Sequence, residues 1–254
     1  MTDIAPELLK NIATSYNSYV SKDAELKRLA KLVNSRKATY AEGDRLARGL
    51  GKALASAIQQ NVSSEVLPNG IMYYNIAEKV LPPLCTGVEN TIADYAMEIQ
   101  RTINEKAGLG INVVRPKHNA DRMNGLVQFA SSDEYDAIAS RLGEAVVNYE
   151  QNVMTETLKE NARVQESLGI EAVVERIYDG RGLHDGKEPC QWCMDRAGIW
   201  KYSDAMANGV FERHDGCGCI INYTIGSRTD NLQGERVYDE KTGKYKTTKK
   251  WVER

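Results

Sequence analysis

The side chains best suited to chemistry in this chain are four cysteines and a histidine in its C-terminal third. All can bind a metal, and they lie between residues 190 and 219: Cys190, Cys193, His214, Cys217 and Cys219. Two cysteines separated by two residues can bind one Zn²⁺ from a single turn, and a second group about twenty residues later can complete a tetrahedral site. The spacing therefore predicts a small unit that a metal holds together.

This cluster offers one ligand more than a structural zinc needs, because a closed site takes four protein ligands. At most four of the five side chains can bind one ion, and the fifth can support the others through hydrogen bonds. The tight Cys217-Gly218-Cys219 spacing leaves open whether His214 takes the place of one cysteine. Two alternatives are a reduced cluster without metal and a redox pair at Cys190 and Cys193, which would leave the second cysteine group unexplained.

A catalytic zinc is the main chemical alternative. Pro189-Cys190-Gln191-Trp192-Cys193 resembles half of the nucleobase-deaminase signature, whose other half is an upstream His-x-Glu or Cys-x-Glu. The residues after His118 and His184 include no such glutamate, and no histidine follows His214 to serve an HNH-type nuclease. Four protein ligands also leave no position for a reactive water. We therefore expect a structural Zn²⁺, no catalytic residue and no enzymatic activity.

The composition is that of an ordinary globular protein, with 42% hydrophobic and 27% charged residues. A formal net charge of −2 gives no global field that would attract nucleic acid or an anionic membrane. No apolar run approaches the roughly 20 residues that span a bilayer, and no secretion signal is visible at the N-terminus. We therefore expect a reducing compartment, where clustered cysteines favour metal over disulfides. The isolated Cys85 is expected to be a small apolar residue within a helix.

The first two thirds of the chain are predicted to be helical, because apolar residues recur there every three to four positions. Pro82-Pro83 should kink or split one of these helices, and residues 111–120 should be extended. Ser132-Asp133-Glu134 should cap the last helix, which Gly169 should end. The expected helices cover residues 6–20, 24–33, 41–60, 71–106, 122–130 and 132–168.

From Ile170 onwards, short β-branched segments replace the helical pattern. Strands are expected at 172–178 and 219–225, a turn at 179–182, a linker at 226–234, and a hairpin formed by 236–239 and 244–247. The sequence therefore predicts a mainly α protein with a small α+β, zinc-ribbon-like C-terminal module: long amphipathic helices followed by short strands and a hairpin. The predicted domains are a helical assembly and docking region (1–168), a Cys/His zinc-stapled module (169–226), and a linker with a basic hairpin tail (227–254).

The residues of the module follow a distinctive order. A strand containing an arginine precedes the Cys-x-x-Cys pair, a glycine, an aromatic residue and Arg-His-x-x-Cys-x-Cys: Arg176, Cys190, Cys193, Gly198, Trp200 and residues 213–219. This order resembles the C-terminal signature of minor head proteins, or head morphogenesis proteins, of tailed bacteriophages. The resemblance covers roughly residues 170–225, and the helical part agrees in length and class alone. Gln191-Trp192 replaces the usual proline-containing pair, and Asp215-Gly216 replaces Pro-Asn.

The resemblance implies a non-enzymatic virion component that is assembled in the host cytoplasm. It implies the portal, the major capsid protein or both as partners, a role in head assembly or DNA delivery, and no membrane. In residues 236–254 Lys and Arg outnumber Asp and Glu, so this tail is a candidate contact for packaged DNA, although a solvated hairpin is the simpler interpretation.

Two functional alternatives are open at this stage. A nucleic-acid-binding zinc-ribbon protein would need a basic surface near the metal, whereas basic and acidic residues nearly balance between Arg181 and Arg213. A zinc-dependent hydrolase or deaminase would need an open coordination position on the metal.

Overall fold

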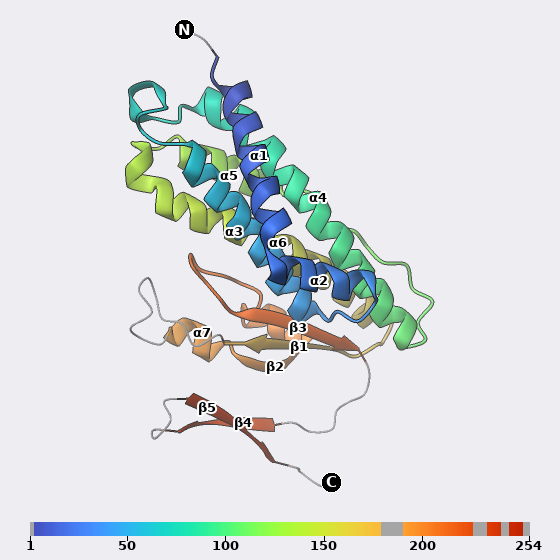
Figure 1. The fold of residues 1–254 in the computed structure, drawn as a ribbon. Helices are drawn as coiled ribbons and strands as arrows, with labels where there is room; N and C mark the ends of the chain where they lie inside the picture. The colour runs from blue at the N-terminus through green and yellow to red at the C-terminus, as the bar shows by residue number, and fades with distance from the viewer. Residues whose placement is uncertain (1–2, 179–189, 226–232, 240–243, 251–254) are drawn as a thin grey trace.

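The computed structural model describes residues 3–178, 190–225, 233–239 and 244–250, with side chains as far as residue 225 (Figure 1). The chain is mainly helical up to residue 167, and a small antiparallel sheet follows. The helices of the first part are α1 (Ala5–Lys22), α2 (Ala24–Asn34), α3 (Tyr40–Asn61), α4 (Tyr74–Lys106), α5 (Ala120–Ala130) and α6 (Tyr135–Ser167), with a 3₁₀ turn at Pro68–Gly70. These elements confirm the predicted helical character of this part.

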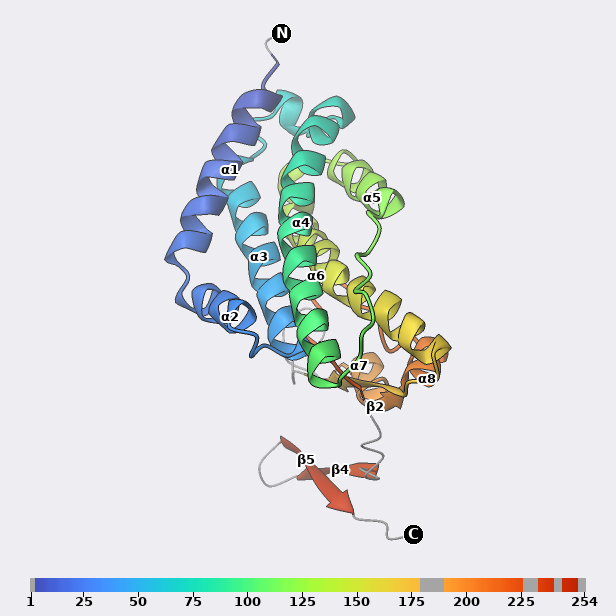
Figure 2. The same cartoon turned by 90° about the vertical axis from the view of Figure 1, so that its right-hand side faces the viewer.

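Helix α3 lies at the centre of the helical part, between α1, α4 and α6 (Figure 2). The predicted stripe of Leu46, Leu50, Leu54 and Ile58 is buried along its length. The backbones of α3 and α6 approach closely at Gly51, where an added Cβ would lie 3.0 Å from the Cα of Val147. The core is therefore built from aliphatic stripes, with a small residue where two helices meet.

Helix α4 is not split at Pro82-Pro83, contrary to one of the expected outcomes, but continues from residue 74 to residue 106. Each proline removes one N–H donor and leaves unpaired the carbonyl four residues earlier, here at Glu78 and Lys79. Both residues are exposed, so water can satisfy these carbonyls. Burial of the opposite face of α4, which includes Leu81, favours the continuous helix.

The ends of α6 follow the prediction in part. Gly169 has φ of +75°, and Ile170 N donates to Gln165 O, so the glycine ends the helix as expected. The helix begins directly after the predicted segment Ser132-Asp133-Glu134, but its N-cap residue Glu134 makes no capping side-chain bond. Instead, Ser64 Oγ accepts a hydrogen bond from Asp136 N at 3.3 Å. Residues 111–119, between α4 and α5, form no helix or strand.

The sheet has the order β2-β1-β3, with β1 (Ala172–Ile177) pairing antiparallel to β2 (Gly198–Lys201) and β3 (Ile220–Ile225). Strands β1 and β3 were predicted, whereas β2 and the short helices α7 (Gln191–Asp195) and α8 (Tyr202–Ala207) were not. The tail forms the expected antiparallel hairpin of β4 (Gln233–Asp239) and β5 (Lys244–Lys250). The predicted turns at 179–182 and 240–243 and most of the predicted linker lie outside the described residues.

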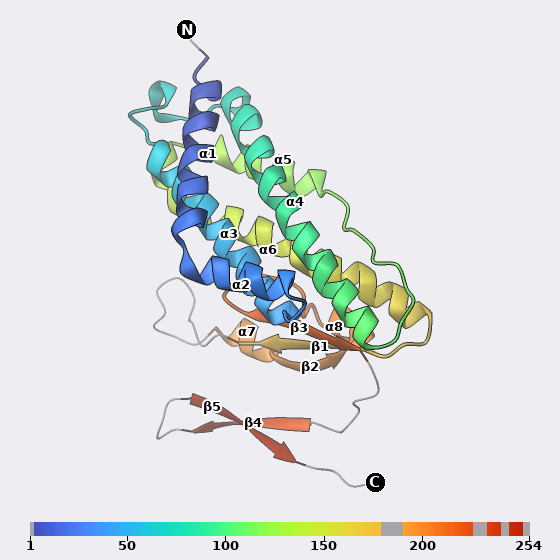
Figure 3. The same cartoon turned by 45° about the vertical axis from the view of Figure 1, so that its right-hand side comes forward.

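The sheet lies across one end of the helical part and shares its hydrophobic core (Figures 1 and 3). Tyr223 of β3 packs edge-on against Tyr40 of α3, with ring centroids 5.7 Å apart. The Tyr223 hydroxyl donates to Gln165 of α6, and the Tyr40 hydroxyl donates to Gln100 of α4 at 2.7 Å. The boundaries of the three predicted domains stay a prediction. None of the described helices combines the length and apolarity needed to cross a membrane.

Candidate metal centre

The first two cysteines are presented by the short helix α7. Cys190 is its N-cap residue, and the Cys190 sulfur accepts a hydrogen bond from the backbone N–H of Cys193 at 3.4 Å. The Tyr178 hydroxyl accepts from Cys190 N at 3.0 Å and so anchors the start of the turn to the end of β1. This turn points both sulfurs into the same space, as a Cys-x-x-Cys pair must do to bind one ion.

The other three side chains belong to the loop that leads into β3. The His214 Nε2 atom lies 3.0 Å from the Cys193 sulfur and 3.4 Å from the Cys190 sulfur. The Cys193 and Cys217 sulfurs are 3.8 Å apart. In a tetrahedral zinc site with Zn–S bonds of about 2.3 Å, neighbouring sulfurs lie about 3.8 Å apart, so the separation of the Cys193 and Cys217 sulfurs fits a metal centre.

The structure thus brings all five predicted side chains together. Two groups have ligand atoms within 4.8 Å of one another, one formed by Cys190, Cys193 and His214 and the other by Cys193, Cys217 and Cys219. All four cysteines are buried. Cys193 belongs to both groups and lies at the middle of the cluster, so a four-ligand set drawn from both leaves one side chain out.

The orientation of His214 suits metal binding. Its Nδ1 atom lies 2.7 Å from the carbonyl oxygen of Asp215, so Nδ1 carries the proton that is donated to this oxygen. The lone pair of Nε2 then faces the sulfurs. The Trp192 ring packs edge-on against the imidazole, with centroids 5.6 Å apart, and restricts its rotation.

A fully buried arginine, Arg176 of β1, neutralises part of the negative charge of this cluster. One end of its guanidinium donates to the sulfurs of Cys193 and Cys217, at 3.7 and 3.5 Å, while the other end donates to the carbonyls of Val210 and Glu212. Burial acts to lower the pKa of Arg176, but the sulfurs outweigh it, and the pKa is raised. Sequence reasoning noted Arg176 as a strand residue and missed this role. The signal was its place in the inward alternation with Ala172 and Val174.

The cysteines differ in their readiness to bind a metal. The pKa of Cys217 is lowered to about 4, because the Cys219 thiol donates a hydrogen bond to it and Arg213 and Arg176 lie close by. The pKa of Cys219 is raised by the same hydrogen bond, and burial raises the pKa of Cys193 to about 12. These shifts favour the thiolate at Cys217 and the thiol at Cys193 and Cys219, so metal binding would release protons from the latter two.

An ion pair between Arg213 and Asp44 ties the ligand loop to helix α3. The two charged groups are 2.6 Å apart, and their side chains are 4% and 1% exposed. Arg213 also donates to the carbonyl of Cys219, and Gln151 of α6 donates to Asp44 at 3.3 Å. Burial raises the pKa of Asp44 to about 6, while Arg213 opposes this rise, so Asp44 is ionised at neutral pH.

Two further hydrogen bonds join the loop to the helices. Arg48 of α3 donates to the carbonyl of Gly218 at 3.2 Å, and the Asn148 amide of α6 donates to the carbonyl of His214 at 3.0 Å. The loop that carries three of the five ligands is thus held by helical residues far from it in sequence.

The remaining cysteine and histidines lie apart from this centre. Cys85 is buried within α4, as expected of a small apolar residue, and burial raises its pKa. The His118 Nδ1 atom lies 2.8 Å from Glu89 Oε2, near α5. His184 lies outside the described residues. The cluster of residues 190–219 is the one group in the described part of the chain where cysteine and histidine gather to hold a metal.

Buried sulfurs, an oriented imidazole and a buried guanidinium make a centre that can hold a metal ion enclosed by protein ligands. Such enclosure is typical of structural sites, whereas catalytic sites keep a position open. No family model, curated protein or solved structure matches the chain. The function must therefore be inferred from these residues and their geometry.

Proposed function

We propose that this chain is a minor head protein of a tailed bacteriophage whose Cys/His cluster binds one structural Zn²⁺. The observation that carries the proposal is the convergence of the residues on which the resemblance depends. Arg176 of β1 contacts Cys193 from the first cysteine pair and Cys217 from the second. A recurring order of strand arginine, Cys-x-x-Cys and His-x-x-Cys-x-Cys is explained if these residues build one centre.

Zinc is the ion that this ligand set favours. Thiolates with one imidazole in tetrahedral arrangement suit zinc, whereas magnesium and calcium need oxygen ligands. The ion would staple a zinc-ribbon-like module whose β2, α7 and α8 have four to six residues each. Structural zinc contributes on the order of 10 kcal/mol of binding free energy to the folding of such units.

In this proposal the module is an assembly device and not an enzyme. Four protein ligands would fill the coordination sphere, so a hydrolase or deaminase reaction would have no place for its water. The long helices offer surfaces for the portal or the major capsid protein, and the 236–254 tail is the candidate contact for packaged DNA. The protein would be present in the virion after assembly in the host cytoplasm.

The metal is tested by elemental mass spectrometry of the purified full chain together with thiol titration under native conditions. We expect one zinc per chain and slow reaction of every thiol, since all five cysteines are buried. Chelator should then expose the four clustered thiols but leave Cys85 protected. A chain without metal, with all its cysteines reacting at one rate, would contradict the structural zinc.

The assembly role is tested in a phage that carries this gene. We expect peptides of the chain in purified heads, in far fewer copies than the major capsid protein, and a loss of infectious particles when the gene is deleted. A chain that accumulates in infected cells but is absent from purified particles would overturn the head-protein assignment and leave the zinc centre standing.

A further inference from the structure

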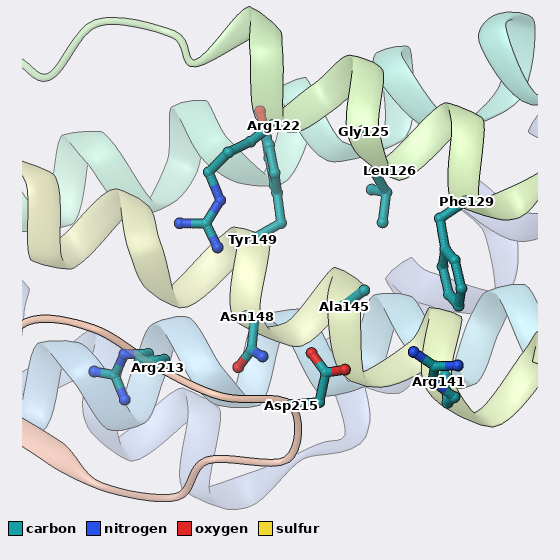
Figure 4. A pocket seen from close by; sticks show the side chains of 10 residues that line it. All are labelled: Arg122, Gly125, Leu126, Phe129, Arg141, Ala145, Asn148, Tyr149, Arg213 and Asp215. Atoms are coloured by element: carbon teal, nitrogen blue, oxygen red, sulfur yellow. The ribbon is translucent and has the colours of Figure 1, made fainter. Parts of the chain in front are cut away.

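A pocket of about 280 Å³ lies between α5, α6 and the ligand loop (Figure 4). Helix α5 lines it with Arg122, Gly125, Leu126 and Phe129, which share one face at helical spacing. Helix α6 contributes Arg141, Ala145, Asn148 and Tyr149, and the loop contributes Arg213 and Asp215. The wall is thus apolar in the middle and cationic at its ends. This pocket is separate from the sulfur cluster and has no part in the proposed function.

Two of its arginines are unusual for this molecule. Every other arginine whose side chain the structure describes lies within hydrogen-bond or ion-pair distance of a carboxylate or a backbone carbonyl. Within the same described residues, the guanidiniums of Arg122 and Arg141 have no such partner, and Arg141 stacks over the Phe129 ring at 5.2 Å. The two arginines left without an anion therefore line the same pocket.

The environment of Arg122 favours the binding of a negatively charged ligand group. Loss of hydration lowers the pKa of its guanidinium, and Arg213 lowers it further, although Glu156 opposes this. Arg213 itself is neutralised by Asp44 at 2.6 Å. A negatively charged oxygen of a ligand would stabilise the charged form of Arg122 and so compensate for its lost hydration.

Hydrogen-bond acceptors between the two arginines favour a ligand that also carries hydrogen-bond donors. Asn148 uses its amide N–H on the carbonyl of His214, which leaves its Oδ1 atom for the pocket. The carboxylate of Asp215 lies beside it, and Figure 4 shows both side chains between Arg122 and Arg141. A peptide can donate backbone N–H groups to these oxygens, whereas a nucleic-acid backbone has no such donors and inorganic phosphate has few.

We propose that this pocket binds a short acidic peptide segment of a protein partner. One carboxylate pairs with Arg122, a second pairs with Arg141, and an apolar residue between them covers Leu126 and Ala145. Arg122 and Phe129, over which Arg141 stacks, are seven residues apart on α5, or about 10 Å at 1.5 Å per residue. A peptide in the polyproline II conformation has three residues per turn and rises about 3.1 Å per residue, so acidic residues three positions apart lie on one face about 9 Å apart and match this span.

The test titrates the full chain with acetyl-Glu-Leu-Ala-Glu-amide at millimolar concentration and follows backbone amide signals by NMR. We expect saturable shifts confined to the pocket faces of α5 and α6 and to the loop at Asp215. The matched peptide acetyl-Gln-Leu-Ala-Gln-amide should bind at least about tenfold more weakly, because it loses two charge-assisted contacts. Equal binding of the two peptides, or no saturable shift with the acidic one, would overturn the proposal.

Variants and competing anions complete the test. Arg122→Gln and Arg141→Gln should each weaken the acidic peptide about tenfold, while Arg163→Gln, which removes an arginine already paired with Glu160, should leave it unchanged. Two separate variants keep the test decisive if one fails to fold. Tighter binding of inorganic phosphate or of single-stranded DNA at the same residues would refute the peptide assignment, as would unchanged peptide binding by both variants.

Discussion

Two buried polar clusters in this molecule differ in whether a buried carboxyl group has a positively charged partner. In the helical part, Glu150 of α6 is fully buried beside Cys85 and Glu89 of α4. The Cys85 thiol offers Glu150 a weak hydrogen bond, and neither carboxyl oxygen of Glu150 has a nitrogen or oxygen partner among the described residues. Near the metal centre, Asp44 is paired with Arg213 at 2.6 Å.

The comparison shows what decides whether a buried carboxyl group is ionised in the folded protein. Burial and the nearby Glu89 raise the pKa of Glu150 well above its ordinary value, so the group avoids its charge by holding a proton. Asp44 is also buried but stays ionised at neutral pH, because Arg213 compensates it. Glu150 can avoid an uncompensated charge by binding a proton, whereas the charges of Asp44 and Arg213 are compensated only while both residues are present. Damage to the second cluster should therefore have the larger effect.

The largest effect is expected when a central ligand is removed. Cys193→Ser should abolish tight zinc binding and unfold the chain beyond residue 170, because zinc contributes on the order of 10 kcal/mol to the folding of such units. Limited proteolysis with mass spectrometry should find new cleavage sites after residue 170, while far-UV circular dichroism keeps most of its helical signal. Native protease resistance beyond residue 170 would show that the staple is dispensable.

The matched control uses the cysteine of the other cluster. Cys85→Ala removes a buried thiol from the helical core and should destabilise it modestly, by about 1 kcal/mol. Its zinc content and its protease map beyond residue 170 should match those of the unmodified protein. Loss of zinc in this variant would mean that the two clusters are not independent.

The next largest effect is expected from breaking the buried ion pair. Asp44→Asn leaves Arg213 buried without its partner, which typically costs about 3–5 kcal/mol. For a chain of this length that corresponds to a fall in Tm on the order of 10 °C, measured by calorimetry. Asp94→Asn, which breaks the exposed pair with Arg115, should shift stability by less than about 1 kcal/mol. Equal effects of the two variants would refute the importance of burial.

A smaller effect is expected at the arginine that faces the sulfurs. Arg176→Met fills a similar volume but removes the donors to Cys193 and Cys217, together with those to the carbonyls of Val210 and Glu212. Loss of such supporting contacts lowers metal affinity about 10- to 100-fold. Competition with a chelator measures this change. Arg196→Met is the control, because Arg176 and Arg196 both stack on Trp192, at 5.1 and 4.0 Å, but Arg196 donates to a backbone carbonyl and not to a sulfur. Similar losses in both variants would assign the effect to packing on Trp192.

Local patterns were sufficient to predict much of this fold. The stripe on α3 appears in the sequence because burial imposes a period on a helix face, and β1 was predicted because β-branched residues are concentrated in a short segment. The five candidate metal ligands could be predicted because cysteine and histidine are otherwise scarce in the chain. In each case residues close in sequence carry the whole signal.

The features that were missed depend on distant partners. Nothing near Asp44 indicates that Arg213 will pair with it, and Ser64 caps α6 from another part of the chain. Strand β2 has four residues, too few for a period, and forms because β1 lies alongside. Packing of α4 likewise overrides the local effect of Pro82-Pro83. Tertiary contacts decide such features, so a reading of local patterns cannot supply them.

The last prediction concerns Glu150, whose effect develops gradually and appears as a pH dependence. The folded-state pKa of Glu150 is raised above the ordinary value of 4.5, so above about pH 4.5 the unfolded chain ionises this group while the folded protein still binds the proton. Stability should therefore fall as pH rises from 4.5 towards the raised pKa, by at most about 1.4 kcal/mol per pH unit. Glu150→Gln should remove this slope and stabilise the protein at neutral pH.

The difference in stability between the two proteins is the quantity to follow by denaturant unfolding, because Asp44, whose pKa is also raised, contributes equally to both. Glu160→Gln on the exposed side of α6 should leave the slope in place. A constant difference across the pH range would mean that Glu150 is already compensated in the folded protein, and the contrast between the two clusters would disappear.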